Sequence, residues 1–362
     1  MKKPLIALAV LAAAGTASAQ SSVQIFGTLD VTLVHSSGSL TSKTQLANSG
    51  LSPAAIGFRG VEDLGGGMLA GFWLEASANT DEGIGQASNS NNQASGAGAA
   101  VAGRQGLVFN RRSTVSIGGN WGELRLGRDF TPSYWNIGIF DPFGNNGVAK
   151  TLTVENSPGV TGVTGVRASN AITYTYGQAF NNPARGGFEG FGGSLSYYLG
   201  ENNSGAATSK DGNGVSGRAF YRAGPLEVAV SSGKTEYVAG DIRQSNVGAS
   251  YDFGVAKLIA HIARDKNGAV KAKGAVLGGS VVVGPTGLLR ASYSTYETDA
   301  VGNPKSSKVG IGYVYSMSKR TTLFTTAAKL RNSGGAAFSL QQSTTAPNNG
   351  SRAFEMGVRH VF

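Results

Sequence analysis

The sequence predicts an all-β protein folded as a sixteen-stranded antiparallel β-barrel that crosses a membrane. The last nine residues alternate strictly, so that one strand face could contact lipid and the other water. The lipid-facing set would be Phe354, Met356, Val358, His360 and Phe362. A cleavable leader at the other end indicates export. With 55 glycines, 40% apolar residues and no apolar run near 18 residues after the leader, transmembrane helices are excluded.

The leader occupies residues 1–19 and predicts a secretory signal peptide. Lys2 and Lys3 precede an apolar stretch from residue 5 to residue 15, and Ala17-Ser18-Ala19 then supplies small residues for cleavage. The alternative, an N-terminal membrane anchor, is disfavoured because the apolar core is too short. We therefore expect the mature protein to begin at Gln20 and residues 20–362 to form one barrel domain.

Segments of about ten residues with period-two alternation recur along the chain and predict the strands. The first runs over residues 23–34. Its apolar face would carry Val23, Ile25, Leu29, Val31 and Leu33, and its polar face Gln24, Thr28, Asp30 and Thr32. We expect Asp30 to point into the lumen.

Short turns and long connections alternate between these segments. The predicted tight turns contain Gly, Asn, Asp or Pro and cover residues 62–66, 119–122, 223–225, 252–254, 284–287 and 316–320. The long connections, rich in Asn, Ser, Gly and Thr, cover residues 78–109, 130–166, 200–215 and 331–351. This asymmetry is typical of barrels with short periplasmic turns and longer external loops.

Closure into a barrel leaves no strand edge unpaired in lipid. A soluble β-sandwich is the alternative, but it would bury its aromatic residues centrally. Tyrosines instead recur near strand ends, as interfacial girdles require: Tyr174, Tyr176, Tyr197, Tyr198, Tyr251, Tyr293, Tyr313 and Tyr315.

The charge is basic: without Lys2 and Lys3, 29 basic residues remain against 21 acidic residues, a net charge of about +8. The basic residues are scattered, with no run or tail, so nucleic acid is not expected as a partner. Small anions and anionic lipid headgroups are expected as partners instead.

Cysteine is absent, which excludes disulfides and thiolate chemistry. The three histidines lie far apart in sequence, and we expect no metal site and no cofactor.

Seven stretches resemble the Gram-negative general porins of β-proteobacteria and span the mature chain in the shared order. They are residues 23–30 (VQIFGTLD), 57–67 (GFRGVEDLGGG), 70–75 (AGFWLE), 111–116 (RRSTVS), 122–129 (GELRLGRD), 318–321 (SKRT) and 357–362 (GVRHVF). The resemblance implies an outer-membrane homotrimer of sixteen-stranded barrels, each a water-filled pore for passive diffusion of small hydrophilic solutes, with no enzymatic activity.

The resemblance also implies a long third external loop folded inward, here between Asp129 and Val166, with residues 140–144 similar to its tip. Further expected partners are outer-membrane lipid, lipopolysaccharide and the assembly machinery that recognises a terminal aromatic residue, here Phe362. In this family anions are often preferred because arginines line the constriction. The resemblance carries Arg111, Arg112 and Arg167 to that site.

The alternation of side chains along a strand indicates which of these arginines can point into the lumen. Arg167 and Arg112 share a face with small polar residues and should point into the lumen. Arg111 shares its phase with Val115 and Ile117, and a lipid-facing arginine at mid-membrane would cost roughly 2 to 4 kcal/mol. Arg111 must therefore lie at a bulge or beyond the strand end. By the same test, Arg59 and Arg125 should also point into the lumen.

One departure concerns Ala55, which stands where the family often has a third constriction arginine. Arg128 and Lys257 are candidate substitutes, and Glu75, Asp129 and Asp141 are candidates for an acidic side facing the arginines. The alternative role for Arg59 and Arg125 is to brace the wall through Glu62 and Glu123. Guanidinium suits a selectivity site because it stays charged at any relevant pH.

Other signals are weaker. Residues 65–70 fit G-x-G-x-x-A, but no helix follows to hold a phosphate, and residues 233–235 lack the upstream glycine of a phosphate loop. A barrel hydrolase using the lumenal His261 is the enzymatic alternative. The competing non-channel function is a barrel whose external loops act as an adhesin or receptor surface.

Overall fold

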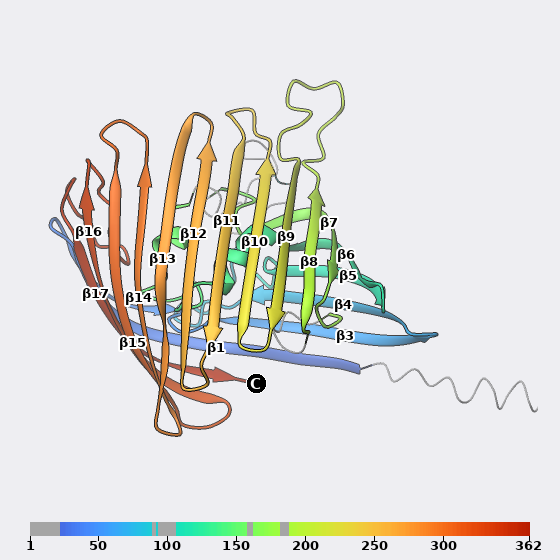
Figure 1. Cartoon of the computed structure of the whole chain (residues 1–362), viewed down its shortest axis with the longest axis horizontal. Helices are drawn as coiled ribbons and strands as arrows, with labels where there is room; N and C mark the ends of the chain where they lie inside the picture. The colour runs from blue at the N-terminus through green and yellow to red at the C-terminus, as the bar shows by residue number, and fades with distance from the viewer. Residues whose placement is uncertain (1–21, 89–91, 93–105, 158–161, 182–187) are drawn as a thin grey trace, which may run out of the picture.

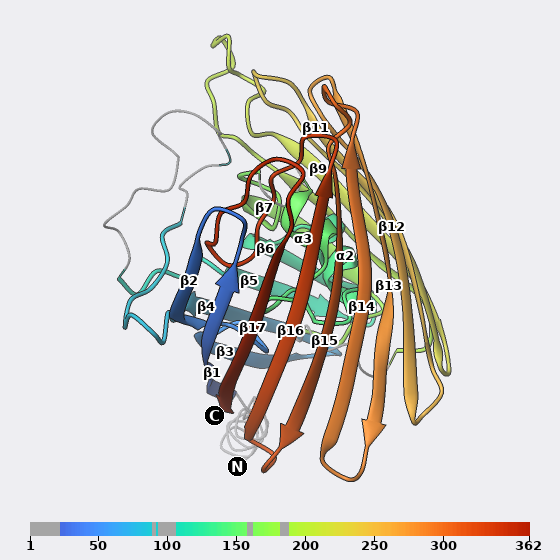
Figure 2. The same cartoon turned by 90° about the vertical axis from the view of Figure 1, so that its left-hand side faces the viewer.

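The computed structural model describes residues 22–88, 92, 106–157, 162–181 and 188–362. The predicted signal peptide and its cleavage site lie outside these residues. Sixteen strands form a ring in which each strand is antiparallel to the next (Figure 1). The pairing of β17 with β1 closes the ring, and Figure 2 shows these two strands side by side.

The strands of the ring range in length from the 8 residues of β5 to the 16 residues of β1. Their bounds are β1 Ser22–Ser37, β3 Ala55–Gly65, β4 Met68–Ser77, β5 Arg112–Gly119, β6 Gly122–Phe130, β7 Arg167–Tyr176, β8 Gly190–Tyr198, β9 Gly214–Ala223, β10 Leu226–Thr235, β11 Ile242–Asp252, β12 Ala256–Asn267, β13 Val270–Val283, β14 Gly287–Thr298, β15 Lys305–Ser316, β16 Thr321–Ser333 and β17 Ser351–Val361. The predicted sixteen-stranded barrel is confirmed.

A seventeenth strand, β2 (Ser42–Asn48), was not predicted. It forms a hairpin with the second half of β1, pairing with residues 31–37, while β3 pairs with residues 22–28 of the same strand. Because β2 shares its edge of β1 with β3, it extends the wall without adding a member to the ring.

Side chains alternate between the two faces of the wall, as the sequence predicts. On β1, Val23, Ile25 and Leu33 are exposed on the outer face, while Asp30 and Thr32 are buried on the inner face. Asp30 accepts hydrogen bonds from the backbone N–H groups of residues 50, 51 and 52 at 2.8 to 2.9 Å. This carboxylate therefore fixes the connection between β2 and β3.

The predicted tight turns lie together at one end of the barrel and the predicted long connections at the other, which we call the long-loop end (Figure 1). One predicted turn was placed too early: β3 continues to Gly65, and the chain reverses at residues 65–67, where all three glycines have positive φ values. Two helices interrupt the connection after β6, namely α2 (Pro132–Ile139) and α3 (Leu152–Asn156). No helix among the described ranges is long and apolar enough to cross a membrane.

Phe362 lies at the seam between the two ends of the barrel chain. Its N–H donates to the carbonyl of Gly27, and its carbonyl accepts from the N–H of Gly27, both at 3.1 Å. A Cβ at Gly27 would lie 2.2 Å from the Phe362 ring, so only glycine allows this close approach. The terminal aromatic residue therefore helps to close the ring.

Candidate pore constriction

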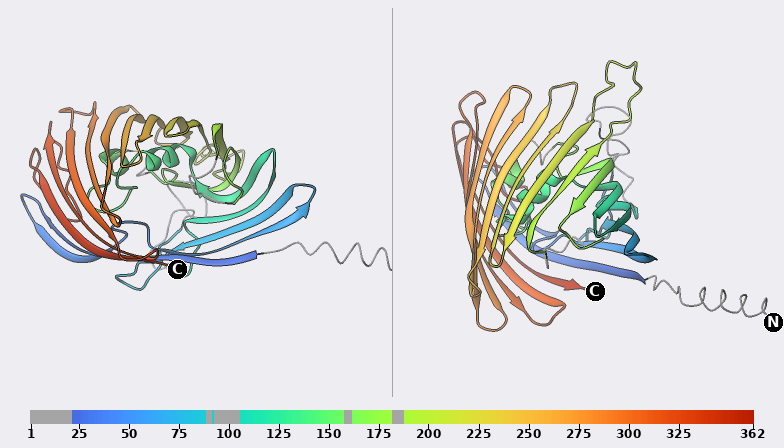
Figure 3. Two further views of the ribbon diagram at one scale, coloured as in Figure 1. Left: turned by 60° about the horizontal axis from the view of Figure 1, so that its bottom comes forward. Right: turned by 45° about the vertical axis from the view of Figure 1, so that its right-hand side comes forward.

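The connection between β6 and β7 lies inside the ring, as the left view of Figure 3 shows. Its first helix, α2, follows the inner faces of β9, β10 and β11. The Ser133 N–H donates to Ser216 Oγ at 3.0 Å, and Asn136 Nδ2 donates to Asn246 Oδ1 at 2.6 Å. Arg218 Nε donates to Asn136 Oδ1 at 2.8 Å. These polar contacts attach α2 to the wall.

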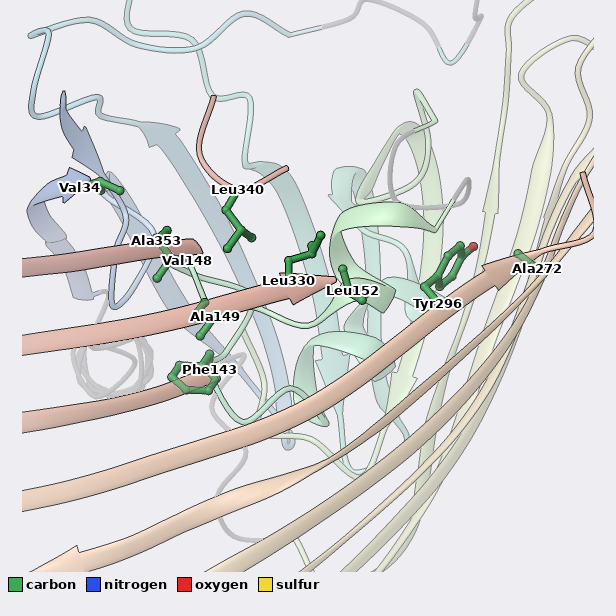
Figure 4. Packing of buried hydrophobic residues seen from close by; sticks show 11 residues of the cluster. Val34, Phe143, Val148, Ala149, Leu152, Ala272, Tyr296, Leu330, Leu340 and Ala353 are labelled. Carbon is green, nitrogen blue, oxygen red and sulfur yellow. The ribbon is translucent and has the colours of Figure 1, made fainter. Parts of the chain in front are cut away.

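The second half of this connection packs through apolar side chains. Figure 4 shows Phe143, Val148, Ala149 and Leu152 against residues of β1, β13, β14, β16 and β17. The Val148 N–H also donates to Glu355 Oε1 at 3.0 Å, and Lys308 pairs with Glu155 at 2.5 Å.

Glycines on the wall provide the space for these contacts. A Cβ at Gly248 would lie 2.0 Å from the Phe140 ring, and one at Gly310 would lie 2.5 Å from Ala149 Cβ. The helices of the connection thus contact β8 to β11 and β13 to β15. The inner faces of β4 to β7, whose side chains are largely buried, lie beside Phe130, Pro132 and Trp135.

Arginines gather on this side of the wall around Trp73 of β4. The guanidinium carbon of Arg112 lies 4.6 Å from a Trp73 ring centroid, and that of Arg59 lies 5.0 Å from it. Trp73 Nε1 donates to Glu75 Oε2 at 3.0 Å. Stacking on an indole stabilises a guanidinium without neutralising it, so Trp73 brings two positive charges together.

Arg111 lies just outside a strand, as the alternation requires, because β5 begins at Arg112. Its N–H donates to the Glu75 carbonyl at 3.1 Å, and its side chain forms an ion pair with the Glu75 carboxylate. Arg111 thereby avoids the lipid-facing phase and joins the arginines of the inner wall.

A second group joins Arg112 and Arg125 to carboxylates of β6. Arg125 pairs with Glu123 at 2.9 Å and with Asp129 at 3.3 Å, and Arg112 lies 3.6 Å from Asp129. All four side chains are buried. Arg125 therefore braces the wall through Glu123, whereas Arg59 hydrogen-bonds Gln24 at 2.8 Å and forms no ion pair within the described chain.

Arg128 lies beside a β-bulge. Strict alternation would turn it outward with Leu126, but the register of β6 against β7 shifts between Gly127 and Asp129. Arg128 then donates to the Asn110 carbonyl at 2.6 Å and to Ser169 Oγ at 2.8 Å. The positive φ of Gly127, 125°, accompanies the bulge.

Arg167, the first residue of β7, stacks on Phe130, with its guanidinium carbon 4.2 Å from the ring centroid. A cavity of about 50 Å³ lies beside these groups, lined by Trp73, Glu75, Arg112, Arg125, Asp129, Phe130, Pro132, Trp135, Thr173, Thr175, Gln178 and Ser194. The buried Arg112 Nη2 and Arg167 Nε have no hydrogen-bond partner within the described protein.

The candidate acidic residues do not form a separate side facing the arginines. Glu75 and Asp129 lie on the same wall as the arginines and pair with them. Asp141 accepts hydrogen bonds from the N–H groups of Phe143, Asn145 and Thr151 at 2.8 to 3.1 Å. Burial raises the pKa of Asp141, while these N–H groups act to lower it. Its carboxylate fixes the tip of the connection, a role that spacing alone could not reveal.

Lys257 lies apart from the arginines. It is the second residue of β12, beside a short turn, and its register partners are Asp252 and Ser280. Being on the other half of the barrel from β3 to β7, it does not substitute for the missing arginine at Ala55.

Among the basic residues of the inner wall that were missed from the sequence are Arg218, Arg290 and Lys308. Each is covered by the connection that contains α2 and α3. Arg218 pairs with Glu227 at 3.1 Å, and the guanidinium carbon of Arg290 lies 4.7 Å from the Phe143 ring centroid. Their inward phase could have been found by testing every basic residue against the alternation.

Comparison with known proteins gives consistent matches over the whole chain. A family model described as Gram-negative porin matches residues 6–335. Outer membrane porin protein 32 of Delftia acidovorans is 35% identical over 381 residues, covering all of both chains. An outer membrane porin protein of Bordetella pertussis is 25% identical, also over all of both chains. Among solved structures, an anion-selective porin from Comamonas acidovorans is 30% identical with a TM-score of 0.78, covering 94% of this chain and 100% of that chain.

Proposed function

The chain belongs to the Gram-negative porin family and is an outer-membrane channel for passive diffusion, and from that premise we propose that its arginine wall favours small anions. The wall consists of six residues on or beside β3, β5, β6 and β7: Arg59, Arg111, Arg112, Arg125, Arg128 and Arg167. The observation that carries the proposal is their grouping on one side of the inner wall, where two of them stack on Trp73 and two line the cavity beside it.

The charge balance supports an anion preference of moderate size. Three carboxylates, those of Glu75, Glu123 and Asp129, lie among the six arginines, so a positive excess remains at the wall. An ion that sheds part of its hydration at a narrow point is stabilised by fixed charges of opposite sign. The ion pairs and Ala55 both reduce the positive field, and we expect chloride to be favoured only mildly.

Substitution of Arg167 tests the proposal. Arg167→Ala removes a positive charge that no carboxylate neutralises by an ion pair within the described chain. We expect the reversal potential across a potassium chloride gradient to shift toward potassium. The matched control is Arg264→Ala, which removes the same charge from the exposed outer face of β12. Equal reversal potentials for wild type and Arg167→Ala would remove Arg167 from the constriction.

We infer the mature ends, the oligomeric state and the partners of this chain from its membership of the porin family. The mature protein is residues 20–362 after removal of residues 1–19, and it forms a homotrimer that needs no cofactor and catalyses no reaction. The C-terminal strand with Phe362 contacts the barrel-assembly machinery, and the outer wall contacts outer-membrane lipid and lipopolysaccharide. Small anions and hydrophilic solutes pass through the lumen. An adhesin or receptor role of the loops would become the better account if the folded protein showed no conductance.

A further inference from the structure

The connection between β7 and β8 differs from the tight turns beside it. It lies at the end of the barrel opposite the long-loop end, which we call the tight-turn end, because Thr175 near the end of β7 pairs with Glu123 at the start of β6. Only residues 224 and 225 join β9 to β10 at this end, whereas residues 177–189 join β7 to β8. The first residues of this longer connection contact the inner wall.

Two glycines form a recess in the inner wall that receives the ring of Phe180. Gly71 of β4 shares its phase with Trp73, and Gly118 of β5 shares its phase with Arg112, so both glycines face the lumen. A Cβ at Gly71 would lie 3.0 Å from the Phe180 ring, and a Cβ at Gly118 would lie 2.7 Å from it. The absence of side chains at these two positions leaves room for the ring, and the connection therefore enters the barrel.

Asn181 fastens the same segment to three strands. Its Nδ2 donates to the Gly60 carbonyl of β3 at 3.0 Å and to the Phe72 carbonyl of β4 at 2.9 Å. Its backbone N–H donates to Glu123 Oε2 of β6 at 3.1 Å. Asn181 is buried, and its φ of 49° is a conformation that asparagine adopts more readily than most residues. Buried donors are costly to leave unpaired, so these hydrogen bonds hold the segment against the inner wall.

The segment also lies next to the arginine wall. Gln178 lines the cavity of about 50 Å³ together with Arg112 and Arg125. Glu123, which accepts from the Asn181 N–H, is the carboxylate that pairs with Arg125 at 2.9 Å. The segment therefore approaches the arginines from the tight-turn end, whereas the connection that contains α2 and α3 begins and ends at the long-loop end.

We propose that residues 178–181 form a second narrowing of the channel, on the tight-turn side of the arginines, and that Asn181 is the residue that positions it. A segment packed on the inner wall occupies width that water and ions would otherwise fill, and the width of a pore limits the flow through it. This narrowing is a property of the channel whichever ion the arginines favour.

The first test removes the Asn181 side chain without straining the backbone, because glycine adopts a positive φ freely. Asn181→Gly should release the segment and raise the single-channel conductance of the full barrel by about half. The matched control is Asn303→Gly, the same substitution at an exposed residue with a φ of 53° in the connection between β14 and β15. We expect the control to conduct as wild type. Equal conductance in the two variants, or a lower conductance in Asn181→Gly, would overturn the proposal.

The second test leaves Phe180 and Asn181 in place and uses the absence of cysteine from the chain. Gln178→Cys introduces a single thiol beside the arginine cavity, and N-ethylmaleimide adds an uncharged group to that thiol. We expect complete alkylation, measured by mass spectrometry, to lower the conductance by at least about a third. Alkylated Asn303→Cys should conduct as wild type. Unchanged conductance of alkylated Gln178→Cys, or a thiol that the reagent does not reach in the folded barrel, would contradict a narrowing at this place.

The reversal potential separates this inference from the proposed anion preference. Asn181→Gly and alkylated Gln178→Cys change no charge, so we expect both to alter conductance while the reversal potential keeps its wild-type value. A channel that shows these conductance changes without a preference for chloride would support the second narrowing and contradict only the arginine proposal.

Discussion

At the scale of single residues, the inner wall combines two uses of arginine. Arg125 is held by two carboxylates, whereas Arg59 and Arg167 lie against aromatic rings and keep their charge unpaired. Removing one partner of a buried ion pair leaves the other partner uncompensated, which is costly. Bracing and selectivity can therefore be separated by choosing which arginine to replace.

Arg125→Met should destabilise the barrel by on the order of 3 kcal/mol, because Glu123 and Asp129 would remain buried without their shared cation. The measurement is the unfolding midpoint in denaturant. The matched variant Arg59→Met removes a cation that has only a hydrogen bond to Gln24, and we expect a loss below about 1 kcal/mol. Equal losses in the two variants would argue against a bracing role specific to Arg125.

The sequence predicted the orientation of some of these residues but not of all. Alternation correctly turned Arg112 inward and placed Arg111 outside a strand. It could not anticipate the register shift between β6 and β7 beside Arg128, because a bulge adds one residue that a period of two does not reveal. It also could not show that Asp141 would be surrounded by backbone N–H groups, since that depends on the fold of one connection.

At the scale of elements, the period of two in the sequence predicts the strands. It does not predict the path of the connection between β6 and β7. Each strand needs only one apolar face toward lipid, a pattern that is visible locally. The course of residues 131–166 depends on contacts with strands more than a hundred residues away, such as those of Val148 with Glu355 and Phe140 beside Gly248. The strand β2 was missed because residues 42–48 were assigned neither to a strand nor to a connection.

The contact between Phe140 and Gly248 predicts how the connection sets the width of the pore. Gly248→Ala adds a Cβ that would lie 2.0 Å from the Phe140 ring, so the ring and the adjoining chain must move away from the wall. We expect single-channel conductance to fall, because that movement is toward the lumen. Gly217→Ala is the control, since its Cβ would lie 3.6 Å from the nearest side chain. A wild-type conductance in Gly248→Ala would show that Phe140 does not limit the pore.

At the scale of the whole molecule, the barrel depends on a seam between its first and last strands. Phe362 forms two backbone hydrogen bonds with Gly27 and covers it with its ring. The same residue is the proposed recognition signal for assembly. The two roles differ in where they act, because packing is needed in any folded barrel, and recognition only in a cell.

Deletion of Phe362 separates these roles. If the residue serves recognition as well as packing, the deletion should lower the amount of folded barrel in the outer membrane several-fold more than it lowers refolding into detergent in vitro. If it serves packing alone, both should fall together. Phe362→Tyr retains the aromatic ring and should behave as wild type. Electrophoretic mobility without heating measures the folded fraction, and normal assembly of the deletion variant would refute the recognition role.

We propose above all that the arginine wall makes the pore favour anions. Its most direct test is the reversal potential of the purified wild-type protein in a planar bilayer across a potassium chloride gradient. The account predicts stepwise conductance with a potential biased toward chloride. A neutral or potassium-biased potential would contradict it, and would mean that the ion pairs of Glu75, Glu123 and Asp129 cancel the field that the arginines provide.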